Sequence, residues 1–240
     1  MRVLVVTAVR AEADSAAAGL APDGTVTAHR IPGGHTLHRC AGAGTTVDVM
    51  AGGVGPAAAA AATATALTAA ATAAPGAPAY DLVVSAGIGG GFAGVAPPGT
   101  LVVADAIVAA DLGAQTSDGH LPVEELGFGR SVHPPAPLSE RIAEALDAVH
   151  GPVLTVSTVT GTADRAAELT ARHPRAAVEA MEGFGVAEAA ATHGVPVVEI
   201  RAVSNAVGPR DRSAWRIGEA LDALRKAFRL LRPVLEEEAR

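Results

Sequence analysis

Two carboxylates and one amide stand where the sequence predicts the ends of strands. Glu12 follows the apolar run 2–7, Glu182 lies between a strand-like and a helix-like run, and Asn205 follows the apolar run 195–203. Because open α/β sheets bind ligands beyond the carboxyl ends of their strands, these side chains could share one site. A carboxylate in such a site can accept a proton from water or stabilise a developing cation.

Each of these residues also has an ordinary structural explanation. A carboxylate in the first turn of a helix is stabilised by the helix dipole, which would account for Glu12 and for Glu182. An Asn after a strand is a common turn or cap residue, which would account for Asn205. Taken singly, these explanations are preferred. The shared position of the three residues next to strand ends is what favours a site.

The glycine-rich segment 89–94 fits the pattern G-x-G-x-x-G and follows a predicted strand. A dinucleotide-binding fingerprint requires a helix to begin there, with its N-terminus facing the pyrophosphate. Pro97 and Pro98 follow instead, and a helix cannot run through that pair. A dinucleotide-dependent oxidoreductase is therefore disfavoured, although glycines after a strand still allow a ligand to approach the backbone closely.

The sequence lacks the motifs of several other classes of enzyme. The sequence contains neither G-x-S-x-G nor a P-loop, and its one lysine, Lys226, lies in the last predicted helix. His35, His38 and Cys40 could suggest metal ligands, but in a strand residues 35 and 38 point to opposite faces. We therefore expect neither a metal nor a cofactor.

Composition narrows the class of protein further. The 240 residues include 18 Lys and Arg against 25 Asp and Glu, a net charge of −7, which argues against a nucleic-acid partner. A single cysteine excludes an internal disulfide, and a hydrophobic fraction of 49% excludes a disordered chain.

No targeting or membrane segment is expected. The apolar run 2–7 is short and charged residues follow it, unlike a signal peptide. The uncharged stretch 51–80 is long enough to span a bilayer, but it consists mostly of Ala and Thr with a single Leu and has no flanking Lys or Arg. The expected location is the cytoplasm.

Strand and helix patterns alternate along the whole chain. Strands are predicted at 2–7, 25–30, 36–40, 45–50, 81–86, 100–109, 152–158 and 195–203, and helices at 11–19, 57–73, 138–149, 163–172, 183–193 and 215–232. The proline-rich segment 111–137 is expected to be an irregular lid or interface loop. Near-continuous apolar strands between helices predict a single α/β domain over residues 1–240, with a central mixed twisted sheet flanked by helices.

These residues resemble the superfamily of purine nucleoside phosphorylases and methylthioadenosine nucleosidases. The resemblance covers nearly the whole chain and rests on five motifs in the expected order. They are the strand before Glu12, the turn 52–55 with its Ala-rich helix, the glycine loop 85–92, Met181-Glu182-Gly183, and the segment 201–205 that ends at Asn205.

The resemblance implies a role for each matching position. Glu12 would orient and deprotonate an attacking water, and Glu182 would hold the ribose hydroxyls with Met181 packed under the sugar. Further substrate contacts are implied for Ile88, Gly89 and Gly90 beside the ribosyl group, and for Thr158 and Val159 at the base. Nucleosidases of this superfamily need no metal or cofactor, and the resemblance also suggests a homo-oligomer.

Asn205 departs from the adenine-specific members, which carry an acid at this position. Its amide offers one acceptor and one donor, and a 6-oxopurine leaving with N7 protonated presents a donor at N7 and an acceptor at O6. We therefore predict hypoxanthine as the leaving base. Because an amide cannot supply the proton to N7, water or another group must do so.

Water is the favoured nucleophile. A phosphorylase must hold an anion beside the sugar, which normally requires an arginine. The segment 83–87 has no arginine where the phosphorylases of this superfamily place one, and Arg10 would have to act alone. A phosphorylase, a methylthioadenosine-type nucleosidase and a nucleoside-binding protein without turnover remain as alternatives.

The segment 208–216 resembles the superfamily's nucleosidases of the alternative menaquinone pathway, whose substrate carries an aromatic carboxylate on its 5′ side. Arg210 or Arg212 would pair with that carboxylate, and Trp215 or Phe92 would line the pocket. Arginines before a helix are also ordinary solvated charges, and Trp215 could be a core residue.

Overall fold

The computed structural model describes residues 1–42, 44–73 and 80–240. A ten-stranded mixed sheet runs through it in the order β11-β10-β6-β12-β5-β1-β4-β3-β2, and β9 pairs with β6. The strands are β1 (Arg2–Thr7), β2 (Val26–Arg30), β3 (Thr36–Ala41), β4 (Thr46–Ala51), β5 (Leu82–Gly91), β6 (Leu101–Ala109), β9 (Val132–His133), β10 (Val149–Thr155), β11 (Val178–Ala180) and β12 (Val197–Ala206).

The long strand β5 changes its partner along one edge. Residues 82–85 pair with the parallel strand β1, whereas Gly90 and Gly91 pair with the antiparallel strand β11. The other edge of β5 pairs with β12 along nearly its full length. Because β12, β6, β10 and β11 are also neighbours, the last part of β5 closes a ring of five strands.

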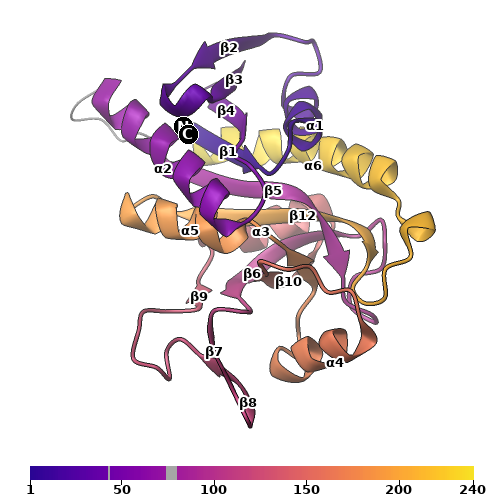
Figure 1. Ribbon diagram of the computed structural model, residues 1–240. Coiled ribbons are helices and arrows are strands. Elements are labelled where there is room, and N and C mark those ends of the chain that lie inside the picture. Colours follow the sequence, from indigo (N-terminus) through magenta and orange to yellow (C-terminus); the bar gives the residue numbers. More distant parts are fainter. Residues whose placement is uncertain (43, 74–79) are drawn as a thin grey trace.

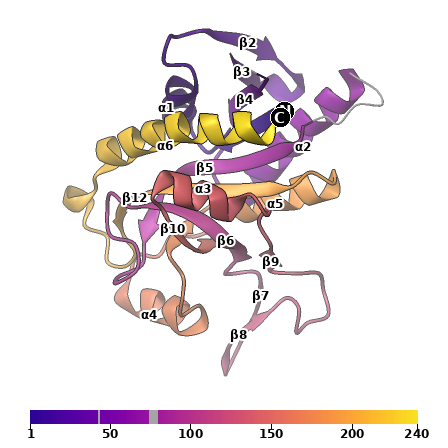
Figure 2. The ribbon, with the colours of Figure 1, turned by 180° about the vertical axis from the view of Figure 1, so that it is seen from behind.

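Helices cover both faces of the sheet. Figure 1 shows α2 and α5 in front of it, and Figure 2, seen from behind, shows α6 and α3. The helices are α1 (Arg10–Leu20), α2 (Pro56–Ala73), α3 (Ser139–Leu146), α4 (Ala163–Arg172), α5 (Gly183–Thr192) and α6 (Ile217–Glu238). Within β1, Val3 and Val5 pack in the cluster with α1, α3 and α6, whereas Leu4 and Val6 pack in the cluster with α2 and α5. Burial on both faces explains why the strand sequences are almost continuously apolar.

The predicted fold, a single α/β domain with a helix-flanked mixed sheet, is confirmed. The differences are some element ends, one connection, and the short strand β11, which was not among the strands predicted. The predicted helix 138–149 ends at Leu146, because Asp147 adopts a left-handed conformation with φ of 50° and β10 begins at Val149. The segment 111–137 is more regular than expected. It contains a two-stranded hairpin, β7 (Gly113–Thr116) and β8 (Gly119–Pro122), and the short strand β9.

Among the described residues, no helix is both long and apolar enough to cross a membrane. Most of the uncharged stretch 51–80 forms the end of β4, the turn after it and the Ala-rich helix α2, which packs against α5. Residues 74–79 of that stretch lie outside the described residues.

Candidate active site

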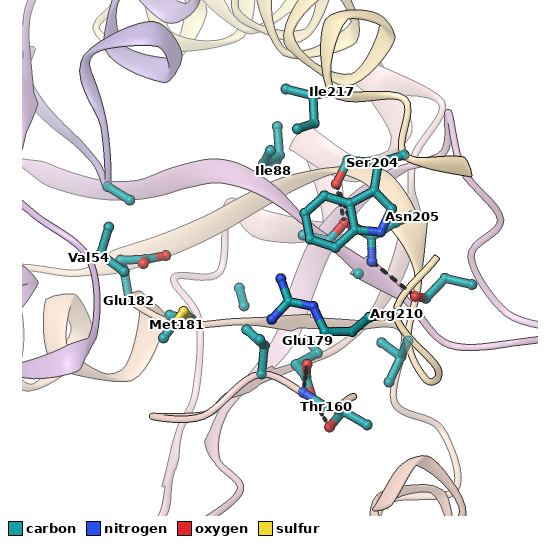
Figure 3. A pocket seen from close by; sticks show the side chains of 18 of the residues that line it. Val54, Ile88, Thr160, Glu179, Met181, Glu182, Ser204, Asn205, Arg210 and Ile217 are labelled. Carbon is teal, nitrogen blue, oxygen red and sulfur yellow. Dashed lines mark hydrogen bonds between the residues drawn. The ribbon is translucent and has the colours of Figure 1, made fainter. Parts of the chain in front are cut away.

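A cavity of about 280 Å³ opens at the carboxyl ends of β1, β5 and β12. Figure 3 shows its lining, in which Ile88 comes from β5, Ser204 and Asn205 come from β12, and Glu182 lies at the start of α5. The predicted site residues that line this cavity are Glu12, Ile88, Gly89, Gly90, Val159, Met181, Glu182, Asn205 and Arg210. The structure therefore gathers residues that are up to about two hundred positions apart in the chain.

Three predicted contact residues lie outside this lining. Phe92 is buried in the hydrophobic cluster beside α4, because the chain turns into the core directly after β5. Thr158 is exposed, and its neighbour Thr160 faces the cavity in its place. Arg212 lies in an exposed 3-10 turn over residues 212–214. Trp215 does line the cavity, as expected from the sequence.

Glu12 is buried in the first turn of α1, and three backbone N–H groups point at its carboxylate. Ala8 and Val9 donate to Oε2 at 3.0 and 3.2 Å, and Ile88 donates to Oε1 at 2.9 Å. Burial raises the pKa of Glu12, and the hydrogen bonds from Ile88 and Val9 and the charge of Arg201 only partly oppose it. A carboxylate with a raised pKa is a stronger base than an exposed one, which suits it to accept a proton from water.

Arg201 is buried at the centre of a cluster of charged groups. Its Nε donates to Glu199 at 2.9 Å, and its Nη1 donates to Glu182 at 3.1 Å. Its Nη2 donates to the Ser85 hydroxyl at 3.2 Å. Burial alone would lower the pKa of Arg201, but the charges of Glu199, Glu182 and Glu12 hold it above its ordinary value. Arg201 therefore stays cationic and balances part of the carboxylate charge beside the cavity.

Glu182 is held between two donors at the floor of the cavity. The backbone N–H of Gly55 donates to its Oε1 at 3.2 Å, and Arg201 binds its Oε2. The turn before α2 thereby fixes the carboxylate for which the family resemblance implies a contact with the ribose hydroxyls. Each oxygen keeps a lone pair free for a hydroxyl donor.

Glycines in β5 leave room for this cluster. A Cβ at Gly87 would lie 2.7 Å from both Glu12 Oε1 and Arg201 Nη1, and a Cβ at Gly90 would lie 3.3 Å from Asn205 Nδ2. A larger residue at Gly87 would force the charged groups apart. The glycines of this strand thus serve close packing rather than a dinucleotide-binding turn.

Asn205 reaches the cavity through an irregularity in β12. The pairing between β12 and β5 shifts register between Val203 and Asn205. The Ser204 hydroxyl donates to Asn205 Oδ1 at 2.8 Å, and Asn205 Nδ2 donates to the Ala206 carbonyl at 3.0 Å. The amide oxygen retains one lone pair and the NH2 group one hydrogen, so the amide can still accept from and donate to a base.

Sequence reasoning missed Glu179 and Thr160, which line the same cavity. Both are buried, and Thr160 donates its N–H to Glu179 Oε1 at 2.8 Å and its hydroxyl to Oε2. Burial raises the pKa of Glu179, against the effect of these two hydrogen bonds. The only available signal was an acid inside the otherwise apolar segment 176–181.

The sequence analysis also assigned no function to Arg201 and Glu199. Their spacing is informative, since residues two apart in a strand share a face and both interrupt an apolar run. A buried strand tolerates two such charges only if they pair. Among the described residues, no group of three or more His, Cys, Asp and Glu side chains is arranged to hold a metal ion.

The model of the phosphorylase superfamily matches residues 2–236. The chain belongs to the phosphorylase superfamily. This family membership confirms the resemblance drawn from the five motifs, and it extends over the whole fold.

Two relatives within the phosphorylase superfamily match nearly the full chain. The futalosine hydrolase of Streptomyces coelicolor is 62% identical over 243 residues, covering 98% of this chain and 97% of the relative. The futalosine hydrolase of Acidothermus cellulolyticus is 46% identical, covering 95% of this chain and 89% of the relative.

Solved structures with the same fold are more distant in sequence. The methylthioadenosine/S-adenosylhomocysteine nucleosidase of Colwellia psychrerythraea, in complex with adenine, superposes with a TM-score of 0.79 at 23% identity, covering 98% of this chain and 94% of that one. The S-adenosylhomocysteine nucleosidase of Streptococcus pyogenes gives a TM-score of 0.80 at 18% identity, with coverage of 99% and 97%. At these identities the likeness shows the fold.

Proposed function

We propose that this protein hydrolyses the N-glycosidic bond of futalosine and releases hypoxanthine. The observation that carries the proposal is the placement of two buried carboxylates, Glu12 and Glu182, on one side of a single cavity that also holds Asn205. The 62% identity to a futalosine hydrolase over nearly the whole chain supports the same substrate.

The reaction requires groups of this kind. Cleavage of an N-glycosidic bond develops positive charge on the ribosyl ring and negative charge on the leaving purine. Glu182 binds the ribose hydroxyls, and together with Glu12 it provides negative charge beside the cationic sugar. Glu12 accepts a proton from water as that water attacks the ribosyl carbon, because its raised pKa makes it a competent base.

Asn205 binds the leaving base. Its carbonyl accepts from a protonated N7, and its NH2 group donates to O6 of hypoxanthine. The proton on N7 reaches the base through water, since an amide has none to give. Leaving as a neutral base lowers the barrier to bond cleavage, and the amide holds the base in that form.

The charged cluster favours water over phosphate as the nucleophile. Arg201, the buried arginine nearest to the sugar site, already binds two carboxylates and faces a third. The side chain of Arg10 is 83% exposed and pairs with Asp14 at 3.4 Å. A phosphate dianion would meet an excess of negative charge here, since Arg201 is already paired with carboxylates and Arg10 is exposed and paired with Asp14.

Arg210 is the residue we assign to the carboxylate on the 5′ side of the substrate. Its guanidinium carbon lies 5.3 Å from the centre of the Trp215 ring, and both side chains line the cavity. Arg212 lies at a similar distance, 5.7 Å, from the same ring but does not line the cavity. The two arginines therefore form a matched pair for mutagenesis.

Replacement of Arg210 by Ala is expected to raise KM for futalosine about tenfold or more, because a charge-assisted hydrogen bond to the carboxylate is lost. Arg212→Ala is expected to leave KM near the wild-type value. Steady-state kinetics of both variants would test the assignment. Equal KM values for the wild type and Arg210→Ala would remove it.

The proposed function itself is tested by free-base release, measured by chromatography. Purified protein is incubated with futalosine, inosine or methylthioadenosine, each with and without phosphate. We expect hypoxanthine from futalosine without phosphate. Hypoxanthine only in the presence of phosphate would make the protein a phosphorylase. Adenine from methylthioadenosine alone would contradict the role of Asn205, and no base from any substrate would point to a binding protein.

We also infer a homo-oligomer. Four apolar side chains at the mouth of the cavity are exposed, namely Val9, Val54, Val159 and Ile217 at 44, 57, 40 and 43%. Apolar residues gathered around a cavity mouth are typical of surfaces that another chain covers. Light scattering of the purified protein would give its mass, and a monomer at micromolar concentration would contradict this inference.

A further inference from the structure

We propose that Glu199 is a positioning residue, which orients Arg201 and offsets its charge from behind the cavity. Glu12 and Glu182, which line the cavity, thereby keep their negative charge available to the ribosyl cation. The proposal deepens the proposed function, on which it rests for that cation. Neither Glu199 nor Arg201 is part of the cavity lining, so both act through the residues that are.

Glu199 has one polar partner among the described residues. Its Oε1 accepts from Arg201 Nε at 2.9 Å, and its Oε2 has no hydrogen-bond partner in that part of the chain. The two side chains lie two residues apart in β12, share one face of the strand and are at most 1% exposed. A fully buried carboxylate with an unpaired oxygen lowers stability, and an apolar pair of similar volume is often as stable as a buried ion pair. Stability of the fold alone therefore does not account for Glu199.

Glu199 fixes which nitrogens of the Arg201 guanidinium face the site. With Nε held by Glu199, the planar group directs Nη1 to Glu182 at 3.1 Å and Nη2 to the Ser85 hydroxyl at 3.2 Å. The Glu199 carboxylate also occupies the space that a Cβ on Gly183, the residue after Glu182, would fill. Glu182 is thus supported both at its carboxylate and next to its backbone.

Three carboxylates share the charge of this one guanidinium. Glu199, Glu182 and Glu12 each raise the pKa of Arg201. The charged groups that face Glu12 are Arg201 in β12, which lowers its pKa, and Glu182 at the start of α5, which raises it. Because Glu199 offsets the charge of Arg201, less of the negative charge of Glu12 is neutralised, and more of it acts on the sugar.

The substitution Glu199→Gln tests the role of the charge. The Gln carbonyl can still accept from Arg201 Nε, and the side chain keeps its size, but the negative charge is lost. Arg201 then acts undiminished on Glu12, and we expect the pKa of Glu12 to fall by about one unit. NMR of the glutamate carboxyl carbons follows this titration, with Glu12 assigned by the loss of its signal in Glu12→Gln. An unchanged pKa of Glu12 would overturn the proposal.

The kinetics with futalosine give a second readout. For Glu199→Gln we expect kcat at neutral pH to fall about tenfold and KM to change by less than about twofold, because the sugar becomes cationic only in the transition state. The acid limb of the kcat/KM profile should move to lower pH together with the pKa of Glu12. A limb that stays in place beside a lowered Tm would leave Glu199 as a structural residue only.

Two further variants separate charge from packing. Glu199→Asp keeps the charge on a shorter side chain, so the pKa of Glu12 should stay close to its wild-type value even where Tm falls. Glu140→Gln changes an exposed carboxylate in α3 and should leave the pKa of Glu12 and the kinetics unchanged. An equal fall of the pKa of Glu12 in Glu199→Asp and Glu199→Gln would assign the effect to packing and overturn the proposal.

The charge of Glu199 can also be measured in the wild type, which does not depend on the folding of Glu199→Gln. Burial raises the pKa of Glu199, and the charge of Arg201 opposes that rise. We expect Glu199 to be ionised at neutral pH. Its carboxyl carbon signal, assigned by its absence in Glu199→Asp, would show this, and a protonated Glu199 would overturn the proposal.

These titrations need no substrate. A lowered pKa of Glu12 in Glu199→Gln would support the proposal even if futalosine were not cleaved, a result that would refute the proposed function alone. Release of hypoxanthine from futalosine, with an unaltered pKa of Glu12 in Glu199→Gln, would support the proposed function and refute the role of Glu199.

Discussion

Glu12 is buried, and its carboxylate accepts hydrogen bonds from three backbone N–H groups. Burial raises the pKa of this carboxyl above its ordinary value of 4.5, and the hydrogen bonds reduce the effect without reversing it. Because a base must be ionised to act, turnover should fall as the pH drops through this raised pKa. A pH profile of kcat/KM, which reports ionisations of the free enzyme, is therefore expected to bend above pH 4.5. Full activity maintained down to that pH would contradict the role of Glu12 as base.

Glu12→Gln should separate catalysis from binding. We expect kcat to fall by about 10²- to 10⁴-fold, because the amide cannot accept the proton from water. KM should stay close to the wild-type value, since the ribose hydroxyls and the base bind elsewhere. Steady-state kinetics measure both quantities, with Glu140→Gln as the exposed control. A small effect on kcat would remove Glu12 from the reaction.

Glu182→Gln should affect both quantities. The carboxylate accepts from the ribose hydroxyls in the bound substrate, and these contacts strengthen as the ring becomes cationic. We expect KM to rise and kcat to fall, so that kcat/KM drops more than either one. Equal and small losses for Glu12→Gln and Glu182→Gln would contradict the division of roles between the two carboxylates.

At this scale the sequence indicated the residues that follow strand ends, because chain position alone brings those ends together. Glu12, Glu182 and Asn205 were identified in this way and lie in one cavity, although their roles stay predictions. Glu179 was not identified, because its place in the cavity lining depends on Thr160, nineteen residues earlier, and on its pairing with Gly90. Neither contact has a signature in a single sequence.

At the scale of elements, the start of α5 and the strand β12 fit together only because residue 183 is glycine. A Cβ at Gly183 would overlap the carboxylate of Glu199, which is fully buried and bound to Arg201. Gly183→Ala is therefore expected to lower the free energy of unfolding by about 1–3 kcal/mol.

The matched control for this substitution is Gly218→Ala in α6. No atom lies within 4 Å of a Cβ built there, so the change should stabilise the helix by about 0.5–1 kcal/mol. Urea denaturation measures both variants. Equal stabilities for Gly183→Ala and the wild type would show that Glu199 can move away, contrary to its burial.

The order of the elements followed from periodicity, but some ends did not. The helix predicted over 138–149 ends early because Asp147 adopts a left-handed conformation. Glycine is the usual sequence signal for such a helix end, and none is present at this position. The segment 111–137 contains four prolines, and proline is disfavoured within strands. The sequence therefore did not predict the β7–β8 hairpin.

At the scale of the whole molecule, chemical labelling of Cys40, the one cysteine in the sequence, can be used to follow global unfolding. Cys40 is buried in the larger hydrophobic cluster, and burial raises the pKa of its thiol to about 11. At neutral pH only about one thiol in 10⁴ is then ionised, so thiol reagents should not label the native protein. Labelling should become rapid across the urea transition that fluorescence or circular dichroism records. Rapid labelling without urea would show that this cluster opens locally.

The closed ring of five strands was beyond sequence reasoning. Four of its strands were predicted individually and β11 was not, and the switch of β5 from β1 to β11 depends on contacts between residues about ninety positions apart. Strand patterns predict which segments pair with a sheet and leave the order of pairing open. The cavity lies where this switch occurs, so the location of the site is a property of the whole topology.

Between the residues of β5 that pair with β1 and those that pair with β11, the N–H of Ile88 donates to Glu12 Oε1 at 2.9 Å. The strength of that hydrogen bond depends on whether the carboxylate is charged. Deuterium exchange at the Ile88 amide should therefore accelerate when Glu12 takes up its proton, beyond the change at neighbouring amides bonded to carbonyls. A single backbone position would then report the ionisation of the proposed base in the intact protein, without substrate and without a mutation.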